Sequence, residues 1–105
     1  MIGYKFTGDR YISKGINENL PVEVIILLWD LIEDKRKDTR PMDYLQIFEL
    51  QGLVENGKKL LKITHRQEVP PYKKEYKLKH FIELSGKIYV IDDVDHVTML
   101  WANEY

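Results

Sequence analysis

Cysteine is absent from the 105-residue sequence, and its absence excludes several kinds of chemistry at once. Disulfide bonds, thiolate nucleophiles and cysteine-based zinc sites all need this side chain. Long apolar runs are missing too, since the longest, Val24 to Trp29, is far short of the roughly 20 residues that a membrane helix needs. Met1 to Arg10 lacks the apolar stretch of a signal peptide. We therefore expect a cytoplasmic protein that does not enter the membrane.

Proline and glycine are scarce, with four and six residues, whereas apolar side chains make up 44% of the chain and aromatic ones 11%. This composition is typical of globular proteins and unlike that of disordered ones. A chain of this length suits one domain with one hydrophobic core. We predict a single domain that spans residues 1–105.

Charge is nearly balanced overall, with a net value of -1, but it is unevenly distributed. Residues 58–80 carry eight basic and two acidic side chains, whereas the segments on either side are acidic. A basic segment of this kind can form a surface for an anionic partner. It can also be neutralised by acidic strands that lie beside it in a sheet. The sequence leaves both interpretations open.

The clearest helical pattern runs from about Pro21 to about Lys37, and Asn17 and Pro21 are typical of a helix start. Lys35 and its basic neighbours suit the C-terminal end of the helix dipole. The surplus of apolar surface on this helix indicates deep embedding or a second contact, such as a homodimer. The expected apolar stripe comprises Val22, Ile25, Ile26, Trp29 and Ile32, widened by Val24, Leu28 and Leu31.

Strand patterns occupy most of the remaining chain. Asn56-Gly57 predicts a two-residue type I′ hairpin turn that pairs Glu55 with Lys58 and places Phe48 opposite His65. The core face of this hairpin then carries Tyr44, Phe48, Leu50, Leu61 and Ile63. Other strands are expected within Tyr4 to Ser13, before a Lys14-Gly15 turn, and at Lys74 to Ile82, Lys87 to Ile91 and Val97 to Trp101.

Short connections between these strands favour antiparallel neighbours. We therefore predict an α+β fold, with one main amphipathic helix packed on a mostly antiparallel sheet of five or six strands.

Catalytic groups are hard to assemble from this sequence. His65 falls on the core face of the hairpin, where a neutral, hydrogen-bonded histidine is expected. The serines, Ser13 and Ser85, have no histidine near them in the sequence. We therefore predict no enzyme activity, no catalytic residues and no cofactor.

One acidic cluster could in principle bind a hard cation, because magnesium and calcium prefer several carboxylate oxygens. The cluster lacks the glycine and the terminal glutamate of a calcium loop. Aspartates are also common in polar turns. We favour a plain turn over a metal site for these residues, which are Asp92, Asp93, Asp95 and His96.

The densest group of reactive side chains is the stretch HRQEVPPYKKEY, His65 to Tyr76. Its two prolines exclude ladder hydrogen bonds, so they end one strand and redirect the next through an extended, polyproline-like bend. Beyond them, lysines alternate with Tyr76 and Leu78, so that the lysines project from one face of a strand. These lysines either protect a sheet edge or form a binding surface. The binding residues that we predict are Arg66, Pro70, Pro71, Tyr72, Lys73, Lys77 and Lys79.

Four stretches together resemble a family of small uncharacterised proteins from Gram-positive bacteria, their phages and mobile elements, which is classified as a domain of unknown function. They are RYISKGINENLP (Arg10 to Pro21), DYLQIFEL (Asp43 to Leu50), HRQEVPPYKKEY (His65 to Tyr76) and GKIYVIDDVDHVTMLWANEY (Gly86 to Tyr105). The resemblance covers nearly the whole chain and implies a cytoplasmic domain of about this length. It brings no established activity and no catalytic residues to any position.

Our leading hypothesis from the sequence is a non-catalytic interaction domain that binds a protein partner through the segment from Arg66 to Lys79. Rigid aromatic side chains surrounded by charge make good contact surfaces. The alternative is a nucleic-acid-binding protein, for which the basic residues are Lys58, Lys59, Lys62, Arg66, Lys73, Lys74, Lys77 and Lys79.

Overall fold

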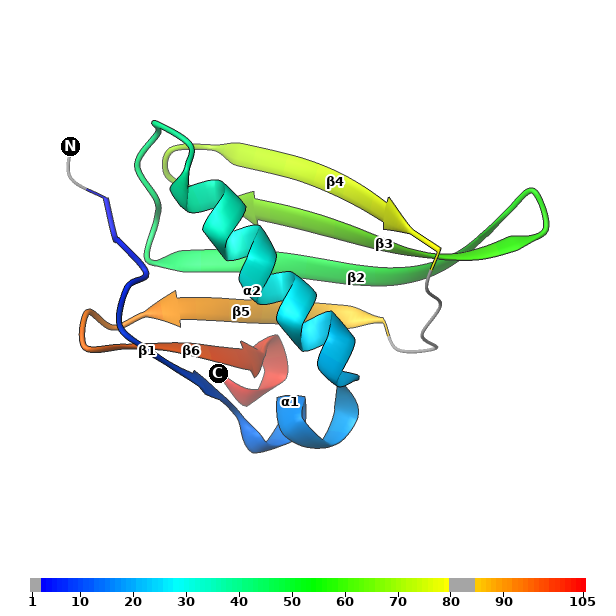
Figure 1. The fold of residues 1–105 in the computed structure, drawn as a ribbon, viewed down its shortest axis with the longest axis horizontal. Helices are drawn as coiled ribbons and strands as arrows, with labels where there is room; N and C mark the ends of the chain where they lie inside the picture. Colours follow the sequence, from blue (N-terminus) through cyan, green and yellow to red (C-terminus); the bar gives the residue numbers. More distant parts are fainter. Residues whose placement is uncertain (1–2, 80–84) are drawn as a thin grey trace.

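A six-stranded sheet with one long helix across one face forms the body of the protein, in a computed structural model that describes residues 3–79 and 85–105 (Figure 1). The strand order is β1-β6-β5-β2-β3-β4. Strand β1 pairs with β6 in parallel, and every other neighbouring pair is antiparallel. The elements are β1 (Asp9–Ile12), α1 (Lys14–Asn19), α2 (Val22–Arg36), β2 (Leu45–Glu55), β3 (Lys58–Gln67), β4 (Tyr72–Leu78), β5 (Gly86–Asp92), β6 (His96–Trp101) and the 3-10 helix η1 (Ala102–Glu104). This confirms the predicted α+β class.

The β2–β3 hairpin has the register that its turn predicts. Asn56 and Gly57 both have positive φ, as a type I′ turn requires, and Glu55 pairs with Lys58. Phe48 lies opposite His65, and both are fully buried. The predicted core face is confirmed at Phe48, Leu50, Leu61 and Ile63 but wrong at Tyr44, which lies just before β2 and is 41% exposed. Residues of β5 and β6 extend this core, namely Ile88, Val90, Val97 and Met99, and α2 covers it.

Helix α2 begins and ends within one residue of its predicted bounds, and most of its predicted apolar arc is buried. The predicted stripe is wrong at Val22 and Ile26, which stay 64% and 55% exposed. The prediction is confirmed for the other core residues of the helix, which are Val24, Ile25, Leu28, Leu31 and Ile32. No helix in the described part of the chain is long and apolar enough to cross a membrane.

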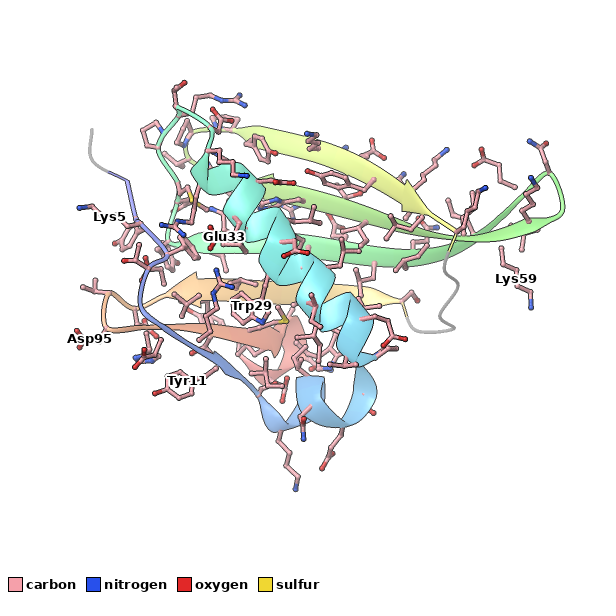
Figure 2. The ribbon with its side chains drawn as sticks, viewed as in Figure 1. Lys5, Tyr11, Trp29, Glu33, Lys59 and Asp95 are labelled. Atoms are coloured by element: carbon pink, nitrogen blue, oxygen red, sulfur yellow. The ribbon has the colours of Figure 1, made fainter. Side chains whose placement is uncertain are left out.

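Trp29 is partly covered by the N-terminal segment. The Arg10 guanidinium lies 4.9 Å from the centre of the Trp29 ring and also pairs with Glu33. Trp29 and Glu33 lie on the side of α2 that faces β1 (Figure 2). A cation above an indole face is a favourable contact that holds this strand against the helix.

The connection from β1 to α2 differs from the prediction. Where a turn at Lys14-Gly15 was expected, a short helix, α1, begins, and Ser13 caps it by accepting a hydrogen bond from the Ile16 amide at 3.1 Å. Ser13 Oγ also donates to the Glu104 carboxylate at 2.6 Å, and Glu104 accepts from the Gly15 amide at 3.1 Å. These hydrogen bonds, first that from Ser13, lower the pKa of Glu104. The carboxylate thus joins η1 to the start of α1.

The prolines separate β3 from β4 as predicted, since β3 ends at Gln67 and β4 starts at Tyr72. Residues 68–71 form a compact turn, with a cis peptide bond before Pro70, instead of the expected extended bend. Along β4, Tyr76 lies opposite Ile63 and Leu78 opposite Leu61, so these two side chains share the core face, as expected. The predicted strand end at Ile82 lies outside the described residues, as does His80.

Candidate functional site

An open hollow of about 480 Å³ lies beside the turn between β3 and β4. We call it the cationic hollow, because four of its lining side chains carry positive charge. Four of the predicted binding residues line it: Arg66, Pro71, Tyr72 and Lys73. The full lining consists of Arg40, Arg66, Gln67, Pro71, Tyr72, Lys73 and Lys74.

The other three predicted binding residues lie near the hollow but do not line it. Pro70 is within the turn, and its carbonyl accepts a hydrogen bond from Gln67 Nε2 at 2.8 Å. Lys77 lies farther along β4, with its Nζ 3.0 Å from a Glu55 carboxylate oxygen. Lys79 is exposed just after β4. The predicted set therefore divides into four residues that line the hollow, Pro70 in the adjacent turn, and two lysines near the end of β4.

Tyr72 is held in place by cations and by an imidazole. Lys35 Nζ lies 4.7 Å from the centre of its ring, and the Arg40 guanidinium lies 5.2 Å from it. The His65 ring meets it edge to face, with the ring centres 5.4 Å apart. Burial is the main reason that the pKa of Tyr72 is raised, so the phenol stays neutral at physiological pH. The ring is a fixed aromatic wall of the hollow.

A buried hydrogen-bond network lies behind Tyr72. The Gln46 amide nitrogen donates to the Asp43 carbonyl at 2.9 Å and to Gln67 Oε1 at 2.7 Å. Its amide oxygen lies 2.7 Å from His65 Nε2, which must therefore carry the proton and donate. Gln67 in turn donates to the Pro70 carbonyl, so the network anchors the turn that shapes the hollow. We call Gln46, His65 and Gln67 the glutamine network.

His65 is neutral, as predicted. It is fully buried and stacks on Phe48 with ring centres 4.3 Å apart. Burial, followed by the nearby charge of Lys35, lowers its pKa from 6.5 to about 3. Because the ring stays neutral at physiological pH, His65 donates a hydrogen bond to Gln46 through its single N–H and contacts Tyr72 edge to face.

Lys35 is the least expected member of the site, because it is only 1% exposed. Burial is the main cause of the lowering of its pKa. Its Nζ lies 3.7 Å from Asp38 Oδ2 and, within the described residues, makes no hydrogen bond. The sequence contained a signal for this burial: Lys35 follows Leu31 by four residues and Leu28 by seven, on the buried side of α2.

Lys35→Met is expected to raise the free energy of unfolding by about 1–2 kcal/mol, because it removes a buried charge that is incompletely paired. Methionine keeps apolar contact with Tyr72, which limits the loss of the cation–π contact. Since the pKa of Lys35 is lowered in the folded state, the wild type regains stability as the pH rises toward 10.5, and the difference between the two proteins should shrink there.

Urea unfolding of both proteins across this pH range measures the effect. Lys37→Met is the matched control, because Lys37 is exposed at the end of the same helix, and its effect should stay within about 0.5 kcal/mol. A clear loss of stability in the Lys35 variant would show that the ammonium group stabilises the fold.

The basic segment is partly neutralised within the sheet. Lys62 Nζ lies 2.8 Å from the Glu75 carboxylate, and Arg66 Nε lies 2.9 Å from that of Glu49. With the pair between Lys77 and Glu55, three of the predicted nucleic-acid contacts therefore have acidic partners. Among the described residues Lys73 forms no direct ion pair, although its charge, after that of Lys62, helps to lower the pKa of Glu75. Its ammonium group is exposed beside the hollow.

The acidic turn between β5 and β6 has a structural role. Asp92 is buried and accepts hydrogen bonds from the Phe6 amide at 2.9 Å and from the Val94 amide at 2.8 Å. His96 pairs with Asp93. In residues 3–79 and 85–105, no group of three or more His, Cys, Asp or Glu side chains is placed to hold a metal ion. The carboxylate of Asp92 orders the turn and ties it to the N-terminal segment.

Arg40, Lys35 and the two glutamines of the network are the site residues that the sequence analysis missed. Arg40 reaches the hollow from the loop after α2, where the hydrogen bond from its side chain lowers the pKa of Asp38. No spacing in the sequence links this loop to the β3–β4 turn, because the contact depends on how α2 crosses the sheet.

The fold and the hollow define the molecule as a small α+β domain with one covered sheet face and a cationic recess at one end of the sheet. The chain belongs to the family described as "Staphylococcal protein of unknown function (DUF960)", whose model matches residues 9–104. This confirms the resemblance to an uncharacterised Gram-positive family. A solved structure, that of a protein of unknown function from Enterococcus faecalis, is 27% identical, with a TM-score of 0.80 over 100% of this chain and 98% of that one. No curated protein matches the chain.

Proposed function

We propose that the protein is a non-catalytic interaction domain that binds a protein partner along the β3–β4 side of its sheet, starting at the turn between these two strands. The contact surface comprises Arg66, Pro70, Pro71, Tyr72, Lys73, Lys77 and Lys79. The observation that carries the proposal is the cationic hollow, in which a fixed tyrosine is surrounded by arginine and lysine side chains. Preorganised aromatic and arginine side chains in a recess are the usual centres of protein interfaces.

Residues of like charge lie opposite each other on β3 and β4, and this arrangement favours an acidic partner. In the strand register Arg66 lies directly opposite Lys73, and Lys62 directly opposite Lys77. Like charges in such positions destabilise a sheet. Glu49 pairs with Arg66, and Glu75 pairs with Lys62, which reduces the repulsion at these two residues. The Lys73 side chain is exposed to solvent at the hollow. An acidic group of a partner would relieve this repulsion on binding.

Affinity capture tests the proposal. Tagged protein is incubated with nuclease-treated lysate of a Gram-positive bacterium, and the retained proteins are compared with those held by the double variant Lys73→Glu with Lys77→Glu. We expect at least one protein to be depleted about tenfold by this charge reversal, a loss of about 1.4 kcal/mol in binding. Retention of every partner by the reversed variant would contradict the proposal.

The matched control is the double variant Lys5→Glu with Lys14→Glu, which has the same net charge. Both lysines are exposed and flank β1, the outer strand at the opposite side of the sheet from β4. This control should retain the partner. Capture from untreated lysate that nuclease abolishes, and that falls with a log–log salt slope near -3.6 for about four phosphate contacts, would instead favour the nucleic-acid alternative.

A further inference from the structure

Strand β4 is the outer strand at one side of the sheet. It pairs with β3 from Gln67–Tyr72 to Leu61–Leu78 and is last in the strand order. In Figure 1 it forms the upper border of the sheet, and within the described residues no strand pairs with its other side. An outer strand offers unpaired backbone N–H and C=O groups to another chain.

The hairpin register identifies which backbone groups of β4 face outward. The residues that close a two-residue hairpin, Glu55 and Lys58, exchange both backbone hydrogen bonds, and such pairs alternate along the ladder. The even-numbered residues of β3 therefore bond to β2, and the odd-numbered residues bond to β4. Their partners on β4 are Tyr72, Lys74, Tyr76 and Leu78. The backbone groups of Lys73, Glu75 and Lys77 are consequently directed away from the sheet.

The charge on this edge selects among strands that could pair with it. All three outward-facing residues are exposed, and Lys74 adds a further exposed cation on the other face of the strand. The Glu75 carboxylate is already paired with Lys62. In the symmetric register that places Glu75 opposite Glu75, a second antiparallel β4 strand would bring Lys73 against Lys77, which opposes self-association in that register. A strand with acidic side chains at alternate positions would instead meet Lys73 and Lys77 on the same face.

We propose that β4 is a docking edge for an extended acidic segment of a protein, which adds to the sheet through the backbone groups of Lys73, Glu75 and Lys77. Strand addition of this kind obtains affinity from main-chain hydrogen bonds and specificity from alternate side chains. The cationic hollow lies at the start of β4, so a segment that follows the edge reaches Tyr72 and Arg40 at one end. This proposal rests on the proposed function and specifies the chemistry of the partner.

The test uses an eight-residue peptide of alternating threonine and glutamate, with a threonine–lysine peptide as the control. Nuclear magnetic resonance of the isotope-labelled protein follows each backbone amide during the titration. We expect the acidic peptide to shift the amide signals of Lys73, Glu75 and Lys77 and to slow their hydrogen exchange. The basic peptide should do neither. Binding of the acidic peptide that leaves these three amides unchanged would overturn the proposal.

A proline variant isolates the contribution of the edge backbone. Glu75→Pro removes an outward N–H without removing a bond to β3, and Glu75→Ala removes the same carboxylate but keeps the N–H. We expect the proline variant to bind the acidic peptide about tenfold more weakly than the alanine variant. Equal affinity of the two folded variants would contradict strand addition, and the amide measurements on the unmodified protein decide the question even where the proline variant is unstable.

The two proposals can fail separately. A captured partner that is lost on reversal of Lys73 and Lys77, but that binds the Glu75→Pro and Glu75→Ala variants equally, would support the interaction surface and overturn strand addition. An acidic peptide that protects the outer amides, together with a lysate from which every protein survives charge reversal, would support the edge and contradict the proposed function.

Discussion

The free energy of unfolding is expected to fall by about 2 kcal/mol between about pH 7.5 and about pH 5, because of His65 alone. In the unfolded chain this histidine binds a proton near its ordinary pKa of 6.5, whereas burial lowers its pKa in the folded protein to about 3. Below pH 6.5 the unfolded state therefore binds more protons, and stability is lost as the pH falls. Each unit costs about 1.4 kcal/mol until the folded histidine is itself protonated.

Urea unfolding at intervals across this range measures the fall. The variant His65→Gln lacks the titrating group and should give a flatter profile above pH 5, where carboxylates with ordinary pKa values stay ionised. His96→Gln is the matched control, because His96 lies partly exposed at the start of β6, and this variant should follow the wild type. A wild-type profile as flat as that of His65→Gln would show that the folded protein accepts the proton on His65.

Gln46→Leu is expected to lower the free energy of unfolding by about 3–5 kcal/mol. Leucine matches glutamine in size, so the loss comes from the three hydrogen bonds of the buried amide. The substitution leaves the carbonyl of Asp43 and the N–H of His65 without their partner, and each unpaired group costs about 1–3 kcal/mol. The amide oxygen of Gln67 loses one of two hydrogen bonds and keeps the one from the Asp43 amide at 3.0 Å. Chemical denaturation with a fluorescence readout gives the value.

The same substitution on the same strand provides the control. Gln51 is exposed on β2, and Gln51→Leu should change stability by no more than about 0.5 kcal/mol. Because Gln67 holds the Pro70 carbonyl, Gln46→Leu should also reduce partner capture, through displacement of the β3–β4 turn. A stability loss below 1 kcal/mol would indicate that the Asp43 carbonyl and the His65 N–H find water or other partners.

Local signals in the sequence predicted the hairpin and the main helix accurately, since each depends on residues close together in the chain. Asn56-Gly57 determined the register of β2 and β3 because the turn geometry leaves one way to close the ladder. The limits of the buried side of α2 were not predictable in this way. Both Ile25 and Ile26 are suitable core residues by their spacing, yet only Ile25 is buried and Ile26 stays exposed.

The candidate site was predicted in part for the same reason. Pro71, Tyr72 and Lys73 are adjacent in the sequence, and their clustering with Arg66 follows from the hairpin that joins β3 to β4. Arg40 was missed because it arrives from a loop more than twenty residues away, brought there by the crossing of α2 over the sheet. Lys35 was assigned to the helix dipole because lysine is almost never fully buried.

The parallel pairing of β1 with β6 constrains the order in which the chain can assemble during synthesis. Strands β2, β3 and β4 are consecutive neighbours and can pair as soon as they leave the ribosome. Strand β1 is made first, yet its partner begins at His96, and the carboxylate that fastens Ser13 belongs to Glu104. The backbone of β1 must therefore stay without its strand partner until nearly the whole chain is made, and contacts of such long sequence separation slow folding.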